Sequence, residues 1–297
     1  MERRLLCLAD PRLRERWTWA AFWHLLAGRG REAVPNEDQG GGWSGLRPAG
    51  HLAPNYPLVV TERTAEELYQ EIISCRRCPR LVEWRERVAV ERRAAFAGEQ
   101  YWGKPLPGFG DPNARLAVVG LAPAAHGGNR TGRIFTGDRS GDWLWAALWR
   151  AGLACQATST RRDDGLKAKD VWVTAVVRCA PPANRPTPTE RDNCVGFLER
   201  ELALLPRLGA VLALGGFAYA ACCRLFGASH PPRFAHGAEL RLPDGRWLVA
   251  CYHPSQQNTF TGRLTEPMLD AAISRALALA RSRTQAAAGA RPRGRQR

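Results

Sequence analysis

The sequence predicts an α/β fold, in which one domain has a central, mostly parallel sheet of four strands flanked by helices. Short apolar runs rich in β-branched residues, each bounded by Gly or Pro, recur from residue 115 onward. Segments with helical periodicity separate these runs, as in a sheet buried on both faces. A chain of 297 residues with 45% hydrophobic residues can bury the core of such a domain.

The expected elements follow one another in a regular order. Thr64, with Glu67 three residues later, predicts the cap of a helix that leads to Cys75. The expected strands are residues 116–121, 171–177, 210–214 and 247–252. The expected helices are residues 141–151, 189–205, 216–226 and 266–282. Thr187 and Glu190 form a capping box at the start of the second of these helices.

Two terminal segments differ in composition from this domain, which is expected to span residues 61–284. Residues 1–60 contain three consecutive glycines and scattered prolines, and they are expected to be a loosely packed extension. Residues 285–297 form an arginine-rich tail. No window reaches the roughly 20 apolar residues of a membrane span, so no membrane association is expected. Charges within the first 23 residues argue against a signal peptide.

A net charge of +15 favours a polyanionic partner, most simply a nucleic acid. Nearly all of this positive charge is arginine, so a GC-rich genome and the basic tail are an alternative explanation.

Four cysteines suggest a metal site. Cys75 and Cys78 form a CxxC pair, Cys179 directly follows a predicted strand, and Cys194 lies near the start of the next helix. Four thiolates suit zinc or a [4Fe–4S] cluster, and the spacing does not choose between them. The alternative is a redox CxxC pair with two unrelated core cysteines. Four thiolates would leave zinc no open position for water, which excludes a zinc hydrolase at this site.

The first strand leads into a long loop, LAVVGLAPAAHGGNRTGRIFTGDRSGD, of the kind that carries an active site in α/β proteins. The turn at residues 120–124 nevertheless has no acid, base or nucleophile. Asp138 is the nearest acid in the loop, and its alternative role, like that of Asp142, is to cap the following helix. The loop lacks the GxxxxGK[ST] pattern of a phosphate-binding NTPase.

Three motifs, in this order and together with the four cysteines, resemble the uracil-DNA glycosylase superfamily. They are GLAPAAHGGNRTGRIFTGD, VVRCAPPANRPTP and HPSQQNTFTGRLT, and the resemblance covers about residues 60–282. Within the superfamily the chain is most similar to the iron–sulfur branch called family 5. The resemblance implies a three-layer α/β/α fold and an enzyme that flips a deaminated base out of DNA, hydrolyses its N-glycosidic bond and leaves an abasic site.

The resemblance also assigns roles to residues of this chain. It implies a structural [4Fe–4S] cluster, held by Cys75, Cys78, Cys179 and Cys194. Family 5 lacks the water-activating residue of the first turn, so we expect Asp138 to activate the water. Asn184 and His253 complete the expected catalytic set, with His253 donating to the leaving base. The structural alternatives are a turn-forming role for Asn184 and a core role for His253.

The expected base-binding residues are Gly120, Ala122, Ala124 and Phe135, with Phe135 stacked on the flipped base unless it is simply a core residue. Relatives with narrow uracil specificity carry an asparagine where this chain has Ala175. We therefore expect activity on uracil and also on deaminated purines such as hypoxanthine.

The segment after His253 is expected to enter the minor groove, and several arginines are expected to contact phosphates. The predicted DNA contacts are Arg130, Arg133, Ser255, Gln256, Gln257, Asn258 and Arg263. No lysine stands in the motifs, so the expected enzyme is monofunctional. It is expected to act as a monomer on DNA in the cytoplasm, at the nucleoid. The rival interpretation is a metal-stabilised DNA-binding module without catalysis.

Overall fold

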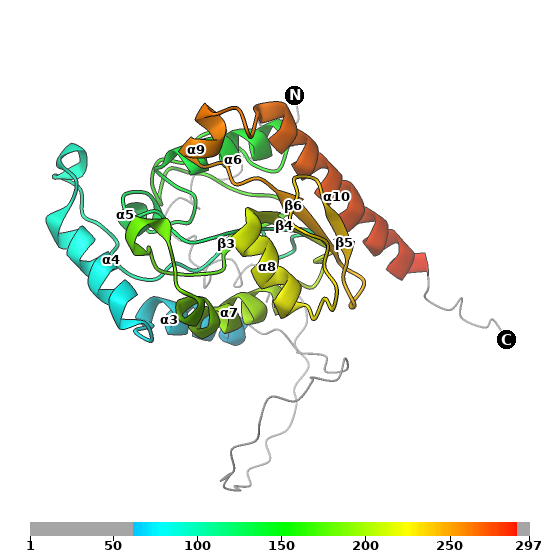
Figure 1. Ribbon diagram of the computed structural model, residues 1–297, viewed down its shortest axis with the longest axis horizontal. Coiled ribbons are helices and arrows are strands. Elements are labelled where there is room, and N and C mark those ends of the chain that lie inside the picture. Colours follow the sequence, from blue (N-terminus) through cyan, green and yellow to red (C-terminus); the bar gives the residue numbers. More distant parts are fainter. Residues whose placement is uncertain (1–61, 290–297) are drawn as a thin grey trace, which may run out of the picture.

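A sheet of six strands forms the centre of the computed structural model, which describes residues 62–289 (Figure 1). Its four central strands are parallel neighbours in the order β3 (Val171–Ala175), β2 (Leu116–Gly120), β4 (Ala210–Leu214) and β6 (Trp247–Cys251). They coincide with the four apolar runs of the sequence, which confirms the parallel core of the fold.

Two short antiparallel strands extend the sheet at its edges, so it has six strands rather than the four expected. β1 (Phe109–Gly110) pairs with β3, and β5 (Glu239–Arg241) pairs with β6. β1 is only two residues long and β5 is partly exposed, so neither has the continuous apolar run of a strand buried on both faces.

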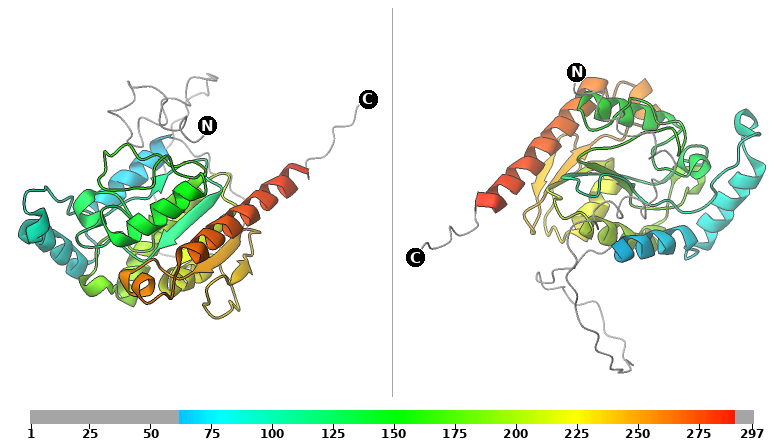
Figure 2. Two further views of the ribbon diagram at one scale, coloured as in Figure 1. Left: turned by 90° about the horizontal axis from the view of Figure 1, so that it is seen from above. Right: turned by 180° about the vertical axis from the view of Figure 1, so that it is seen from behind.

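Helices cover both faces of the sheet and complete the three expected layers. The covering helices are α3 (Glu62–Ser74), α7 (Pro188–Ala203) and α8 (Gly216–Leu225) on one face, and α6 (Arg139–Arg150) and α10 (Glu266–Gly289) on the other. α6 and α10 lie side by side (Figure 2). Successive strand residues point to opposite faces, so Val119 packs on the α3 side and Val118 on the α6 side.

Shorter elements occur in the connections between these layers. They are α4 (Pro79–Glu91), η3 (Ala94–Phe96), α5 (Gly128–Thr131), η4 (Pro182–Asn184) and α9 (Gln256–Phe260). α5, η4 and α9 follow the carboxyl ends of β2, β3 and β6, the edge of a parallel sheet where ligands bind. The fold therefore places all three motifs of the sequence at one edge.

Helix boundaries agree with the sequence except at the two ends. The capping box of Thr187 and Glu190 is present at the start of α7. α3 begins at Glu62, so Thr64 lies within its first turn instead of capping it. α10 continues to Gly289, into the segment expected to be tail. The expected extension, residues 1–60, and the last eight residues of the tail lie outside the described residues. No helix between residues 62 and 289 is long and apolar enough to cross a membrane.

Candidate functional site

A cavity of about 310 Å³ opens among the loops that follow β2, β3 and β6. Four residues that the sequence singled out contribute to its lining, namely Ala124, Asp138, Asn184 and Gln256. The first motif supplies two of them, and the second and third motifs supply one each. Residues more than 130 positions apart in the sequence therefore share one cavity.

Asp138 combines a structural contact with a perturbed acidity. It is the N-cap of α6, and its Oδ1 accepts a hydrogen bond of 2.9 Å from the backbone N–H of Gly141. Burial raises the pKa of Asp138 to about 6, although the hydrogen bond from Gly141 opposes the shift. The expected capping role is thus present, and the same carboxylate faces the cavity with the acidity of a group that exchanges protons near neutral pH.

Glycines allow site side chains to approach the backbone closely. A Cβ at Gly127 would lie 2.0 Å from Oδ2 of Asp138, and a Cβ at Gly120 would lie 2.5 Å from the ring of Phe135. Real Cβ atoms do not approach other atoms this closely, so a side chain at either position would displace the group beside it. The absence of a side chain at Gly120 therefore leaves room for one edge of the Phe135 ring.

Phe135 and His253 lie together beside the end of β2. Their ring centroids are 5.9 Å apart at an interplanar angle of 30°. Phe135 is 6% exposed, has a left-handed backbone with φ 49°, and accepts a hydrogen bond from the indole of Trp145 through its carbonyl. Such a strained, fixed conformation is typical of functional sites. Burial lowers the pKa of His253 to about 4, so its imidazole is neutral at pH 7.

Asn184 and Ala122 have different surroundings from each other. Asn184 is exposed at the cavity rim with φ 55°, which fits its expected turn-forming tendency, and its side chain remains available to the cavity. Ala122 packs against the apolar core on the α3 side of the sheet. Ala175, the register partner of Gly120, ends β3 and is buried.

The structure adds His126 to the cavity, a residue that the sequence analysis passed over. Its Nδ1 lies 3.1 Å from the hydroxyl of Tyr101, and burial lowers its pKa. Arg93 and Arg139 also line the cavity. The contact with Tyr101 could not be predicted, because Tyr101 lies 25 residues upstream. What the sequence does offer is that His126 is the one histidine of the first motif.

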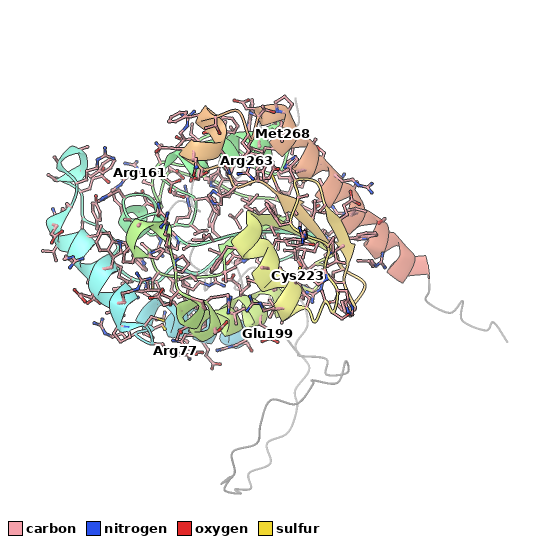
Figure 3. The ribbon with its side chains drawn as sticks, viewed as in Figure 1. Arg77, Arg161, Glu199, Cys223, Arg263 and Met268 are labelled. Carbon is pink, nitrogen blue, oxygen red and sulfur yellow. The ribbon has the colours of Figure 1, made fainter. Side chains whose placement is uncertain are left out.

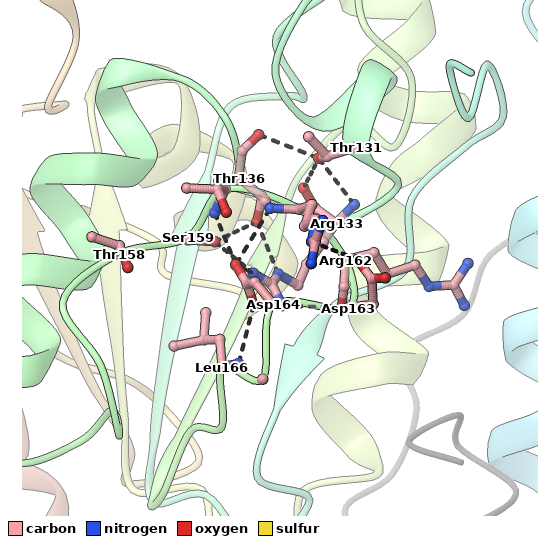
Figure 4. Close-up of polar contacts among 12 residues, drawn as sticks. Thr131, Arg133, Thr136, Thr158, Ser159, Arg162, Asp163, Asp164 and Leu166 are labelled. Atoms are coloured by element: carbon pink, nitrogen blue, oxygen red, sulfur yellow. Dashed lines mark hydrogen bonds and ion pairs between the residues drawn. The ribbon is translucent and has the colours of Figure 1, made fainter. Parts of the chain in front are cut away.

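Arg130 and Arg133 do not have the exposure that a phosphate contact needs, which corrects the expectation for both. Arg133 is 4% exposed, and its guanidinium donates to Asp164, to Ser159 and to Thr136 (Figure 4). Arg130 is 8% exposed and is held by Glu99 and by two backbone carbonyls. Both side chains fix the loop that carries Phe135 and Asp138.

The segment after His253 forms the short helix α9 rather than an open loop. Ser255 is its N-cap, and its hydroxyl accepts from the backbone N–H of Asn258. The Asn258 amide donates to the carbonyl of His253 at 2.8 Å. Gln257 is exposed, as is Arg263, which stacks on the ring of Tyr252 at the same end of the molecule as α9 (Figure 3). The expected phosphate contact of Arg263 is compatible with this exposure.

Cys75, Cys78, Cys179 and Cys194 line a second, smaller cavity, which shares no lining residue with the first. Cys75 follows α3, and Cys78 precedes the first residue of α4. All four are free thiols. In the described part of the chain, no three His, Cys, Asp or Glu side chains are arranged to hold a single metal ion. A tetrahedral zinc with Zn–S bonds of about 2.3 Å draws its four sulfurs to within about 4 Å of one another. The four thiols as they lie therefore do not form a ready site for one zinc ion.

Protein N–H groups surround this sulfur-lined cavity. Nη1 of Arg85 lies 3.0 Å from Sγ of Cys179, and the backbone N–H of Arg178 lies 3.3 Å from Sγ of Cys194. Arg85 is 2% exposed and its Nε has no hydrogen-bond partner. Nη2 of Arg85 donates to the carbonyl of Cys75, and it lies 3.6 Å from Glu86, whose side chain is 43% exposed. The buried guanidinium of Arg85 therefore places a positive charge against the sulfurs of this cavity, an arrangement that suits an anionic group there.

Comparison with known proteins relates this geometry to one family. The model of the uracil DNA glycosylase superfamily matches residues 107–277. The type-5 uracil-DNA glycosylase of Mycobacterium bovis is 57% identical over 207 residues, which are 69% of this chain and 77% of that protein. The type-5 uracil-DNA glycosylase of Thermus thermophilus is 53% identical over 206 residues, 68% of this chain and 92% of that protein. A type-4 uracil-DNA glycosylase from Thermotoga maritima is 30% identical over 199 residues, 67% of this chain and 85% of that protein.

Proposed function

Because the chain belongs to the uracil DNA glycosylase superfamily, we propose that it excises uracil from DNA by hydrolysing the N-glycosidic bond. Relatives that carry the name type-5 uracil-DNA glycosylase support this substrate. The observation that carries the mechanism is the acidity of Asp138 and its place in a cavity shared by all three motifs. The products would be free uracil and an abasic site, without strand cleavage.

Asp138 is the proposed base for the attacking water. As the bond to the base breaks, its electron pair leaves with the base and the sugar acquires oxocarbenium character. Water adds to the anomeric carbon, and its proton passes to the carboxylate. A pKa of about 6 keeps Asp138 ionised at neutral pH and still basic enough to accept that proton.

His253 and Phe135 are proposed to bind the flipped base. The neutral imidazole of His253 can donate a hydrogen bond to the oxygen on which negative charge develops. The ring of Phe135 offers a stacking face, and Gly120 leaves room for the edge of that ring.

Activity on hypoxanthine is part of the proposal. Ala175 at the end of β3 cannot hydrogen-bond to a base through its side chain, which leaves recognition to His253, Asn184 and backbone amides. A pocket with few polar groups rejects altered bases weakly. The protein is proposed to act as a monomer on nucleoid DNA.

A [4Fe–4S] cluster is the group we propose for the cavity lined by Cys75, Cys78, Cys179 and Cys194. Four thiolates bound to such a cluster carry a net negative charge, which the buried guanidinium of Arg85 would neutralise. A bound cluster would cross-link the segment between α3 and α4 to the loop after β3, which carries Cys179, and to α7, which carries Cys194. Cys194→Ser should lower the iron content and visible absorbance of the purified protein, whereas Cys155→Ser, at a half-buried cysteine that does not line this cavity, should change neither.

The primary experiment is a glycosylase assay on labelled duplexes with a G·U or a T·hypoxanthine pair, followed by alkali to reveal abasic sites. The proposal expects cleavage after alkali only, and loss of that cleavage in Asp138→Ala with DNA binding retained. Binding without release of either base would instead support the rival DNA-binding module, consistent with the apolar turn at residues 120–124.

A further inference from the structure

His126 lies in the candidate cavity, and the mechanism proposed above does not use it. It is half-buried in the loop that follows β2, and it lines the cavity together with Asp138 and Asn184. Of its two ring nitrogens, Nδ1 lies 3.1 Å from the hydroxyl of Tyr101. Between residues 62 and 289, no hydrogen-bond partner is found for Nε2. That nitrogen is therefore available to a group that enters the cavity.

Contacts with the backbone and with the ring hold His126 in place. Its carbonyl accepts a hydrogen bond of 2.8 Å from Nε of Arg130. Tyr101 is 7% exposed, and its hydroxyl accepts from the backbone N–H of Arg93 at 3.4 Å. A hydroxyl that accepts this bond can donate its own hydrogen to Nδ1 of His126, which leaves the proton of a neutral imidazole on Nε2.

The imidazole of His126 is neutral at pH 7. Burial lowers its pKa below the ordinary value of 6.5, and the positive charges of Arg93 and Arg130 act in the same direction. A neutral ring can donate a hydrogen bond without adding a positive charge beside Asp138. This matters because a cation there would lower the basicity of the carboxylate.

The carboxylate of Asp138 lies close to the backbone beside this ring. Its Oδ1 accepts the capping hydrogen bond of α6, whereas its Oδ2 lies against Gly127, the residue after His126. A Cβ at Gly127 would be only 2.0 Å from Oδ2, and Gly127 itself lines the cavity. A hydrogen-bond acceptor and a hydrogen-bond donor thus reach one cavity from two points of the same loop.

We propose that His126 is a catalytic residue that holds the attacking water together with Asp138, and that Tyr101 positions its ring. This proposal deepens the proposed glycosylase function and rests on it. The water oxygen accepts from Nε2–H of His126, and one of its O–H groups donates to Oδ2 of Asp138. Two contacts fix the direction of the remaining lone pair, which a single contact would leave free to rotate.

The reaction step balances with these groups alone. The remaining lone pair of the water forms the bond to the anomeric carbon, and the electron pair of the glycosidic bond leaves with the base. The proton of the water passes to Oδ2 of Asp138. His126 keeps its own proton throughout. The loop thereby supplies, just after the apolar turn at residues 120–124, a polar group that the turn itself lacks.

Single-turnover kinetics on a G·U duplex test the role of the ring. His126→Ala should lower the rate of uracil release by about 10- to 100-fold, the value of one hydrogen bond to a charged or reacting group. Its affinity for a duplex with 2′-fluorinated deoxyuridine, which resists hydrolysis, should stay within threefold of wild type. His126→Gln can place an amide N–H near the position of Nε2 and should recover most of the rate. His230→Ala, at an exposed histidine outside the cavity, is the matched control and should behave as wild type.

Double-mutant cycles separate action on one water from a general structural role. If both side chains hold the same water, His126→Ala should cost less than threefold in the Asp138→Asn background. Tyr101→Phe should slow the wild-type protein severalfold but have no further effect in His126→Ala, because Tyr101 acts only through that ring.

Three results would overturn the assignment of His126. They are losses that multiply in the cycle with Asp138→Asn, a His126→Ala rate within threefold of wild type, and a loss of affinity for the uncleavable duplex that accounts for the whole effect. A wild-type protein that released no uracil would refute the proposed glycosylase function itself, which is a different result from these three.

Discussion

Replacing Asp138 with asparagine separates the two roles that its carboxylate has in the structure. Asparagine is as good an N-cap as aspartate, so Asp138→Asn keeps the hydrogen bond from the backbone of Gly141 to the start of α6. It removes the ability to accept a proton. Asp138→Ala removes both and should lose a further 1 kcal/mol or so of stability through the missing cap.

The expected loss of activity follows from the proposed proton transfer. A positioned general base contributes about 10²- to 10⁴-fold, so kcat should fall by that factor in Asp138→Asn. In wild type, kcat/KM should decline as the pH falls through about 6, where the carboxylate becomes protonated. His253 stays neutral over this range because its pKa is about 4, so the variant should lack the decline near pH 6.

Asp138→Asn should stabilise the folded protein at neutral pH even though it lowers activity. The pKa of Asp138 rises from 3.8 in an unfolded chain to about 6, so the folded state binds more protons between these pH values and loses stability as the pH rises. At about 1.36 kcal/mol per pH unit, the charged carboxylate lowers stability at pH 7 by at most about 3 kcal/mol. Asp138→Asn should therefore unfold at a higher temperature than wild type at pH 7.

Single-turnover release of uracil from a G·U duplex between pH 5 and 8, with thermal unfolding of the same samples, measures both effects. If Asp138→Asn released uracil at a rate within threefold of wild type at every pH, Asp138 would only cap α6. A variant that loses activity and also unfolds at a lower temperature would contradict the assigned electrostatic cost.

Three other substitutions test the surroundings of the two cavities. Arg85→Met should speed the loss of iron from the proposed cluster to a chelator severalfold, whereas Arg87→Met, an exposed change on the same helix, should not. Equal rates in the two variants would show that Arg85 is not the counter-charge of the cluster. Glu201→Gln leaves the buried guanidinium of Arg178 without its carboxylate and should destabilise the protein by about 3–5 kcal/mol in denaturant titrations, and a change below 1 kcal/mol would be inconsistent with that pairing. His253→Asn should lower kcat by about 10²- to 10³-fold with an unaltered pH profile between pH 5 and 8, and a shifted profile would mean that the imidazole titrates there.

The parallel strands could be predicted from the sequence because each is buried on both faces and is apolar throughout. β1 and β5 lie at the sheet edges, where one partner strand and partial exposure relax that requirement. The four cysteines that the spacing suggested as one group line one cavity, since the fold brings the segment between α3 and α4 beside the loop after β3 and beside α7.

The environment of a long side chain was harder to predict. Arg130 and Arg133 lie in a glycine-rich loop, which favoured an exposed position, yet their carboxylate partners Glu99 and Asp164 each lie 31 residues away in the sequence. No local sequence pattern predicts ion pairs between residues so far apart in the chain. The same limit applied to His126, whose partner Tyr101 precedes the first strand of the parallel core.

At the glycines around the candidate site, substitution by alanine adds a side chain instead of removing one. At Gly120, Gly127 and Gly141 the added methyl group would meet the ring of Phe135, the carboxylate of Asp138 and the carbonyl of Phe135. Alanine, which elsewhere removes a side chain and reports what that side chain did, is at these three positions the bulky substitution. The placement of the aromatic ring and the acid thus depends on three hydrogen atoms that no list of polar or charged residues would include.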